Sequence, residues 1–301
     1  MPRRNGRAAV ERVPSARAER APAKVNLTLR VVGRRPDGYH DLESLVVFAS
    51  VGDALTLASG PRLSLTVRGP TAGSAGAIAD NLVLKAVNAL GERVDGVKSG
   101  RFVLSKRLPV AAGLGGGSAD AAAALRLLAR KNRLALDDAR LREAARATGA
   151  DVPVCLEPRP RLMSGIGDLL SPPLELPRLA AVLVNPRVAV PTKGVFEKLA
   201  APRVMRVAVM SEDYPPSDRA GLLKYLADRG NDLEAPAIAL QPVVAEVLGA
   251  LRRLSGCRLA RMSGSGATCF ALFDNAKAAA AAARMLRGRK PNWWVRSAML
   301  G

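Results

Sequence analysis

Apolar and polar side chains alternate along several short stretches of the chain, which is the period of β-strands. In the clearest stretch, residues 23–32, Val25 and Leu27 fall on one face and Lys24 and Asn26 on the other. A strand of this kind is usually half solvated, so we expect its polar face to meet water. Further strands are predicted over residues 42–50, 55–57, 63–67, 101–106, 179–185, 269–273 and 293–299.

Other stretches carry apolar residues at helical spacing, with capping residues or glycines at their ends. Helices are predicted over residues 81–90, 121–130, 137–147, 192–199, 222–229, 243–254 and 275–287. Residues 200–220 and the link 231–234 are predicted to be irregular. The second half of the chain therefore mixes helices with a small sheet, and no repeat of fixed period is present.

The length of 301 residues favours two domains over one. Residues 1–20 hold six arginines and little apolar content, which predicts a disordered basic tail. Pro158 and Pro160 interrupt the pattern, so we expect a first domain over residues 21–160 and a second over 161–301. The last strand, about residues 292–299, can return to the first domain.

Four of the five residues from Gly113 to Gly117 are glycine, and they lie between a predicted strand and a predicted helix. Glycine allows positive φ and lets a ligand approach the backbone amides. The free amides and dipole of a helix start favour phosphate, with Ser118 as the expected N-cap and Asp120 in the first turn. The loop is not a Walker A motif, because no lysine follows the last glycine. It is predicted to bind phosphate with a cation supplied from elsewhere.

Two charged residues fit beside such a loop. Lys24 begins the polar face of the first strand and is the residue type that the loop lacks. Asp151 opens an apolar segment, where alone it would be a helix cap, but beside a phosphate loop and a lysine it becomes a candidate general base. Tyr39 and His40 follow a turn signal and would suit either stacking on a flat base or local turn packing.

The net charge of +20 comes mostly from scattered arginines, and aromatic residues make up 3%. This composition favours small anionic ligands over nucleic acid as the main partner. A single histidine, His40, makes a histidine-ligated zinc site or a histidine triad improbable. The absence of an 18-residue apolar run, of an apolar signal core and of metal-like cysteine spacing predicts a cytoplasmic protein without a membrane span.

Three segments together resemble the GHMP kinases, a family of small-molecule kinases. Pro109–Ala119 resembles their phosphate-binding motif, Pro22–Leu27 their first motif and Met262–Phe273 their third. Arg35–His40 and Gly149–Val154 are similar to the branch of the family whose substrate carries a cytidine diphosphate. The similarity spans roughly residues 20–300, and the joint signal is specific although each motif alone is not.

The resemblance implies an α+β fold with a ribosomal-protein-S5-domain-2-like N-terminal domain and a ferredoxin-like α/β C-terminal domain. It implies ATP-dependent phosphorylation of a hydroxyl group, with Mg²⁺, in the synthesis of isoprenoid precursors. It implies that Asp151 is the general base and Lys24 its catalytic partner, that Asn26, Tyr39 and His40 lie near the cytidine, and that Ser118 is a candidate metal ligand. The implied ATP-binding residues are Pro109, Val110, Ala111, Ala112, Gly113, Leu114, Gly115, Gly116, Gly117, Ser118 and Ala119.

Some positions depart from the family pattern. Ala111 and Ala112 stand where relatives often carry glycine, so the front of the loop should be stiffer. Ala119 and Asp120 stand where many relatives carry Ser-Asn, and Asp120 would add a negative charge near the phosphates.

Three alternatives stay open. Another GHMP small-molecule kinase, of the homoserine or mevalonate type, is disfavoured by the segment Pro36–His40. A non-catalytic ligand-binding protein on the same fold is disfavoured by the presence of both Lys24 and Asp151. A basic RNA-associated protein would show steeply salt-dependent RNA binding. The sequence is compatible with a monomer or a homodimer.

Overall fold

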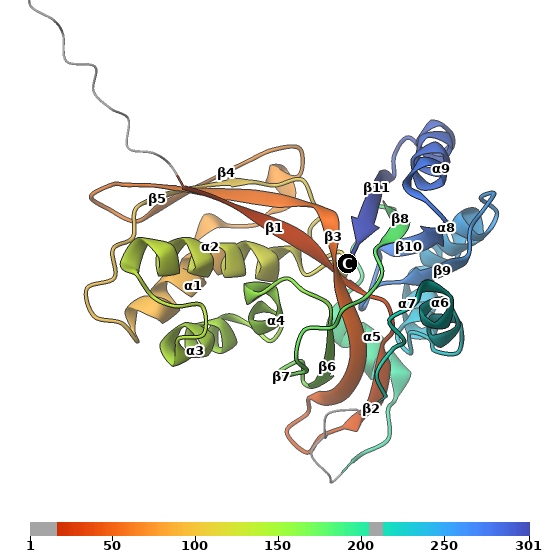
Figure 1. The fold of residues 1–301 in the computed structure, drawn as a ribbon, viewed down its shortest axis with the longest axis horizontal. Coiled ribbons are helices and arrows are strands. Elements are labelled where there is room, and N and C mark those ends of the chain that lie inside the picture. The colour runs from red at the N-terminus through yellow and green to blue at the C-terminus, as the bar shows by residue number, and fades with distance from the viewer. Residues whose placement is uncertain (1–16, 205–212) are drawn as a thin grey trace, which may run out of the picture.

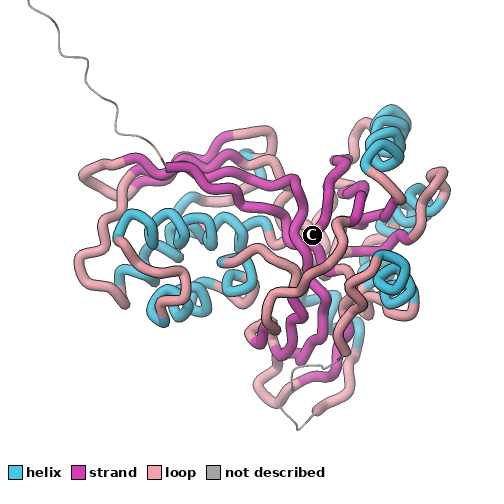
Figure 2. The backbone as a smooth tube through the Cα atoms, viewed as in Figure 1, coloured by secondary structure: helices cyan, strands magenta, loops and turns pink. Residues whose placement is uncertain are grey.

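The computed structural model describes residues 17–204 and 213–301. Strands form a continuous band through the middle of the molecule, with helices on either side (Figure 2). The main path of the sheet runs β4-β5-β3-β11-β8-β10-β9, and β1, β2, β6 and β7 pair outside this path. The strands are β1 (Arg17–Asn26), β2 (Arg30–Arg34), β3 (His40–Ala58), β4 (Ser64–Arg68), β5 (Arg101–Ser105), β6 (Arg161–Gly165), β7 (Leu169–Leu170), β8 (Leu179–Asn185), β9 (Leu259–Met262), β10 (Cys269–Phe273) and β11 (Trp294–Leu300).

The long strand β3 joins the two halves of the molecule (Figure 1). It pairs antiparallel with β1, β2, β5 and β6, and it meets β11 where Leu300 lies opposite Ala49. The β1–β3 register shifts between Pro22 and Lys24, and such bulges re-aim the neighbouring side chains. The strands come close here, since a Cβ on Gly52 would lie 2.7 Å from the Cα of Pro22.

The first half places its helices on one face of β1, β3 and β5. The helices and short 3₁₀ turns of this half are η1 (Ala72–Ser74), η2 (Ile78–Asp80), α1 (Leu82–Gly91), α2 (Gly116–Asn132), α3 (Ala139–Thr148) and α4 (Val152–Leu156). Every residue from Ala119 to Ala129 in α2 is buried, including the charged Asp120 and Arg126. Its small side chains let α2 sit between the sheet and the other helices, so the helix that follows the glycine loop is held rigidly.

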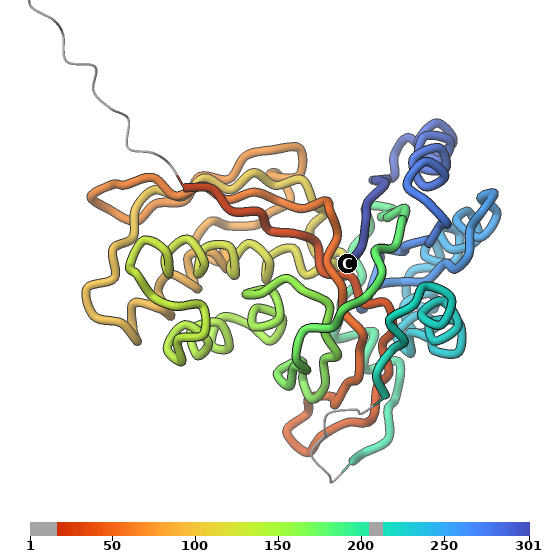
Figure 3. The backbone as a smooth tube through the Cα atoms, in the orientation of Figure 1, coloured from red at the N-terminus to blue at the C-terminus, as the bar shows by residue number. Residues whose placement is uncertain are grey.

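The second half is a smaller sheet covered by helices. These are α5 (Thr192–Leu199), α6 (Arg219–Ala227), α7 (Glu234–Leu240), α8 (Val243–Arg252) and α9 (Ala276–Arg289). Every residue of β8 is buried, because β8 lies between β10 and β11. The chain then ends in the middle of the molecule, where Gly301 and Phe48 exchange backbone hydrogen bonds (Figure 3).

Most predicted elements are present, with several departures. The strands predicted over 42–50 and 55–57 form the single strand β3, and the short elements α4, β6, β7 and β9 have no predicted counterpart. Residues 17–20 belong to β1, so the predicted tail is wrong for them, and residues 1–16 lie outside the described part of the chain. The strand predicted over 23–32 is interrupted between β1 and β2, and residues 234–240, for which no element is predicted, form helix α7. β6 still pairs with β3, so the first sheet continues past the boundary predicted at residue 160.

The polar face of β1 is not solvated as expected. Lys24 and Asn26 are 4% and 2% exposed, because the glycine loop and the turn around residues 263–265 cover them. Buried polar groups need partners inside the protein, and the functional site supplies them.

Candidate functional site

The glycine loop joins β5 to α2 and passes through several left-handed residues. Ala111, Gly113 and Gly115 have φ values of +51°, +72° and +58°, a region open to glycine and costly for alanine. Gly115 is the N-cap residue of α2 and no side chain caps the helix. The predicted Ser118 cap is therefore wrong: the helix starts at Gly116, which puts Ser118 inside the first turn. The first amides of α2 have no acceptor within the helix, which suits an anion.

A second turn, residues 263–268, packs against the glycine loop and is hydrogen-bonded to it. Ser263 Oγ donates a 2.9 Å hydrogen bond to the carbonyl of Gly113, and the amide of Thr268 donates to Ala112 O at 3.1 Å. A Cβ on Gly113 would collide with Ser263 O. Gly113 is therefore required both for its φ and for this close packing. Ser263 lies in the segment that resembles the third family motif, but nothing in the sequence shows that it ties this turn to the loop.

Lys24 and Asp151 are brought together beside the loop, although they lie far apart in sequence. Lys24 Nζ lies 2.9 Å from Asp151 Oδ1, and the side chains are 5% and 37% exposed. The backbone amide of Lys24 donates to Leu114 O at 2.9 Å, which ties β1 directly to the loop. Asp151 stands at the start of α4 without capping it. Its carboxylate is thus available to a ligand while its position is fixed by a buried cation.

The pair and the loop line one cavity of about 320 Å³. The lining residues of this loop cavity include Lys24, Asn26, Ala111, Ala112, Gly113, Gly115, Gly116, Gly117, Ser118, Asp151, Gly264 and Ser265. A cation, a carboxylate and free helix amides around one space are the groups that phosphoryl transfer requires. Pro109, Val110, Leu114 and Ala119, also predicted to bind ATP, are not among the residues lining this cavity.

A second cavity of about 660 Å³ adjoins the first and shares Ser118 and Asp151 with it. Tyr39 and His40 line this aromatic cavity, and His40 stacks on Phe196 with ring centroids 4.6 Å apart and planes at 26°. Tyr39 is 61% exposed, so its ring is free to cover a ligand. Asn26 lines the loop cavity, next to Lys24, and does not line the aromatic cavity. It is therefore not in the same cavity as Tyr39 and His40, the residues implied to lie near the cytidine with it.

Phe196 was missed by the sequence analysis. It belongs to α5 and reaches the cavity from more than 150 positions after His40, so no local pattern relates the two. Burial, reinforced by the positive charge of Arg34, lowers the pKa of His40 below its usual value. The imidazole is therefore neutral at neutral pH and can both donate and accept hydrogen bonds.

Asp120 does not lie in the first turn of α2 as expected, and its carboxyl group already has a partner inside the protein. Lys106 Nζ donates hydrogen bonds to Asp120 Oδ2 at 2.7 Å and to Asp53 Oδ2 at 2.5 Å. All three side chains are buried. Asp53 Oδ1 also accepts the amides of Arg107 and Leu108, which lead into the loop. Burial, with the nearby charge of Asp53, outweighs Lys106 and raises the pKa of Asp120 to about 8. The cluster thus anchors the loop rather than repelling phosphates.

Within residues 17–204 and 213–301, no group of three histidine, cysteine or acidic side chains is arranged to hold a metal ion. In the same part of the chain, no helix has the length and apolarity needed to cross a bilayer.

Comparison with known proteins gives two family matches. Residues 81–157 match the GHMP kinases N terminal domain, and residues 217–292 match the GHMP kinases C terminal domain. The first match contains the glycine loop and Asp151, and the second contains the turn with Ser263.

Two curated relatives are similar over nearly the whole chain. The 4-diphosphocytidyl-2-C-methyl-D-erythritol kinase of Xanthobacter autotrophicus is 57% identical over 289 residues, which is 93% of this chain and 98% of the relative. The protein of the same name from Rhodopseudomonas palustris strain BisB5 is 57% identical over 293 residues, 95% of this chain and 99% of the relative.

Solved structures agree with the fold. A crystal structure of 4-(cytidine 5'-diphospho)-2C-methyl-D-erythritol kinase matches with a TM-score of 0.75 and 36% identity, covering 95% of this chain and 99% of the other. Homoserine kinase from Cytophaga hutchinsonii matches with a TM-score of 0.67 at 19% identity, covering 97% and 96%, which speaks to the fold alone. The predicted α+β kinase fold is confirmed. The chain belongs to the GHMP kinase family.

Proposed function

We propose that this chain transfers the terminal phosphate of ATP to the 2-hydroxyl of 4-diphosphocytidyl-2-C-methyl-D-erythritol. Asp151 accepts the proton of that hydroxyl, the new oxygen–phosphorus bond forms, the bond between the β- and γ-phosphates breaks, and ADP leaves. Lys24 holds the carboxylate in place and offsets the charge that develops on the transferred group. The observation that carries the proposal is the Lys24–Asp151 contact of 2.9 Å in the wall of the loop cavity.

The two adjoining cavities support a substrate with two ends. A hydroxyl beside Asp151 would be close to the loop, while a cytosine ring would fit the aromatic cavity beside His40 and Phe196. Because Asp151 lines both cavities, one extended molecule can reach from the aromatic residues to the base. The names of the curated relatives fit such a substrate.

ATP would lie with its phosphates on the amides at the start of α2. Mg²⁺ usually keeps several waters and takes few protein ligands. The hydroxyl of Ser118, which lines both cavities, is the side chain that we propose for the metal. When bound, the metal would neutralise phosphate charge.

The test is ³¹P NMR of the product formed from ATP and 4-diphosphocytidyl-2-C-methyl-D-erythritol, run beside homoserine and mevalonate. We expect a new phosphomonoester signal and ADP with the cytidine substrate alone. Phosphorylation of homoserine or mevalonate instead would assign the chain to another kinase of the family. ATP binding without ADP release with any of the acceptors would favour a ligand-binding protein.

A further inference from the structure

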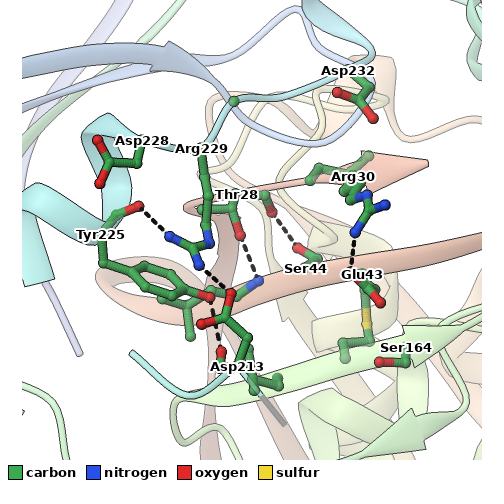
Figure 4. Close-up of a pocket in the computed structure, with 15 residues that line it drawn as sticks. Thr28, Arg30, Glu43, Ser44, Ser164, Asp213, Tyr225, Asp228, Arg229 and Asp232 are labelled. Carbon is green, nitrogen blue, oxygen red and sulfur yellow. Dashed lines mark hydrogen bonds and ion pairs between the residues drawn. The ribbon is translucent and has the colours of Figure 1, made fainter. Parts of the chain in front are cut away.

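Ser44 contacts Asn26, which in turn contacts Lys24 of the catalytic pair. It belongs to β3 and is 2% exposed. Together with Thr28 it forms part of the wall of a third cavity, about 570 Å³, between β3, β6 and the residues that follow α6. Figure 4 shows the Ser44 hydroxyl turned toward Thr28.

The hydrogen bonds of Ser44 have a fixed direction. Its hydroxyl is 2.5 Å from the carbonyl oxygen of Thr28, which can only accept, so the hydroxyl proton is used there. Its oxygen is then left to accept from Asn26 Nδ2, which lies 2.7 Å away. The Thr28 hydroxyl is engaged separately, by the amide of Leu45 at 3.0 Å.

This direction fixes the orientation of the Asn26 side chain. With its NH₂ group on Ser44, Asn26 must turn its oxygen toward Lys24, and Oδ1 lies 3.3 Å from Lys24 Nζ. The reverse orientation would place two donor groups, NH₂ and NH₃⁺, against each other. The Lys24 ammonium group therefore donates to two acceptors, the carboxylate of Asp151 and the amide oxygen of Asn26. The orientation of the Asn26 amide depends on Ser44.

We propose that Ser44 is a positioning residue for phosphoryl transfer, which acts by orienting Asn26 so that its amide oxygen holds the Lys24 ammonium group against Asp151. This inference rests on the proposed function, because the effect expected from the loss of Ser44 is slower phosphoryl transfer. Ser44 touches neither ATP nor the acceptor in this role, so its loss should change kcat and leave both KM values within about twofold.

The first experiment compares Ser44→Ala with Ser44→Thr, which keeps the hydroxyl and adds a methyl group beside a cavity. We expect Ser44→Ala to lower kcat by about tenfold to a hundredfold, since small misplacements of catalytic groups have effects of that order. Ser44→Thr should restore most of it. Ser50→Ala is the control, because Ser50 lies on the same strand, accepts a hydrogen bond from the Met299 amide, and lines neither the loop cavity nor the aromatic cavity; unlike Ser44, it is exposed. A wild-type kcat in Ser44→Ala would overturn the proposal.

A double-mutant cycle tests whether Ser44 acts through Asn26. In an Asn26→Ala background, Ser44→Ala should cause almost no further loss of kcat. A full, additive loss would show that Ser44 acts by another route and would overturn the proposal.

A readout independent of turnover separates this inference from the proposed function. In the wild-type protein, NMR should show Asn26 side-chain amide protons that exchange slowly with water, and a Lys24 ammonium signal that Ser44→Ala broadens or shifts. Rapidly exchanging Asn26 amide protons in wild type would overturn the Ser44 proposal even if the kinase reaction occurs. Slow exchange with no turnover of the cytidine substrate would overturn the proposed function and leave the Asn26 orientation supported.

Discussion

The contact between the loop and Lys24 predicts a specific effect of Gly115→Ala. Gly115 has φ +58°, and a Cβ there would lie 3.2 Å from both Cβ and Cε of Lys24. The methyl group would therefore both strain the backbone and push Lys24, the proposed partner of the base, by a few tenths of an ångström. Gly96→Ala is a matched control, since Gly96 has φ +68° and no atom within 4 Å of its Cβ position.

The two effects can be separated by magnitude. Alanine in the left-handed region costs about 1–2 kcal/mol, and about 0.4–1 kcal/mol is recovered because alanine restricts the unfolded chain. Both variants should therefore lose roughly 1 kcal/mol of unfolding free energy, or about 2 °C in Tm for a chain of 301 residues. Only Gly115→Ala should also lose activity, by about tenfold in kcat, because only there does Lys24 move.

Urea unfolding and initial-rate kinetics on the same preparations check this prediction. Equal stabilities with a selective loss of kcat in Gly115→Ala are expected. Unchanged kcat in Gly115→Ala, or an equal loss in Gly96→Ala, would refute the reasoning that the loop positions Lys24.

Two further predictions concern the aromatic cavity and the buried cluster. Tyr39→Ala and Phe196→Ala should each raise KM for the cytidine substrate by about tenfold and change KM for ATP little. The reason is that stacking of a base on an aromatic ring is worth about 1–3 kcal/mol. Equal effects on the two KM values would contradict stacking. The pKa of Asp120 rises from 3.8 to about 8 on folding, so its contribution to stability is fully present below about pH 4 and is lost as the pH rises toward 8. The difference in unfolding free energy between wild type and Asp120→Asn should therefore shift against wild type as the pH rises from about 4 to 8, and it should level off above pH 8. A difference that does not change with pH would exclude Asp120 as the titrating group.

Elements with a strong local signal could be predicted from the sequence. The strand over 179–185 and the helix over 192–199 have the predicted bounds, because an apolar run and a proline-threonine start are local features. The glycine loop was likewise found from the residues themselves, since left-handed backbone and close approach require glycine.

The misses have a common physical cause, which is packing between distant segments. The polar face of β1 is buried because the loop and the turn around Ser263 cover it, and a strand's own alternation cannot show what lies opposite. The Ser118 cap was wrong because Gly115 begins α2 through its backbone conformation alone. The sequence alone suggests that Asp120 adds a charge near the phosphates, whereas in the structure Lys106, at the end of β5, is hydrogen-bonded to its carboxyl group.

In the proposed reaction, Asp151 is the base and Lys24 its partner in phosphate transfer. The most direct measurement is ADP release with 4-diphosphocytidyl-2-C-methyl-D-erythritol by wild type, Asp151→Asn and Lys24→Ala, with ATP binding measured by calorimetry on each. We expect wild-type turnover, a loss of about 10²–10⁴ in Asp151→Asn, a comparable loss in Lys24→Ala, and retained ATP binding in both variants. Normal turnover by either variant would contradict the account.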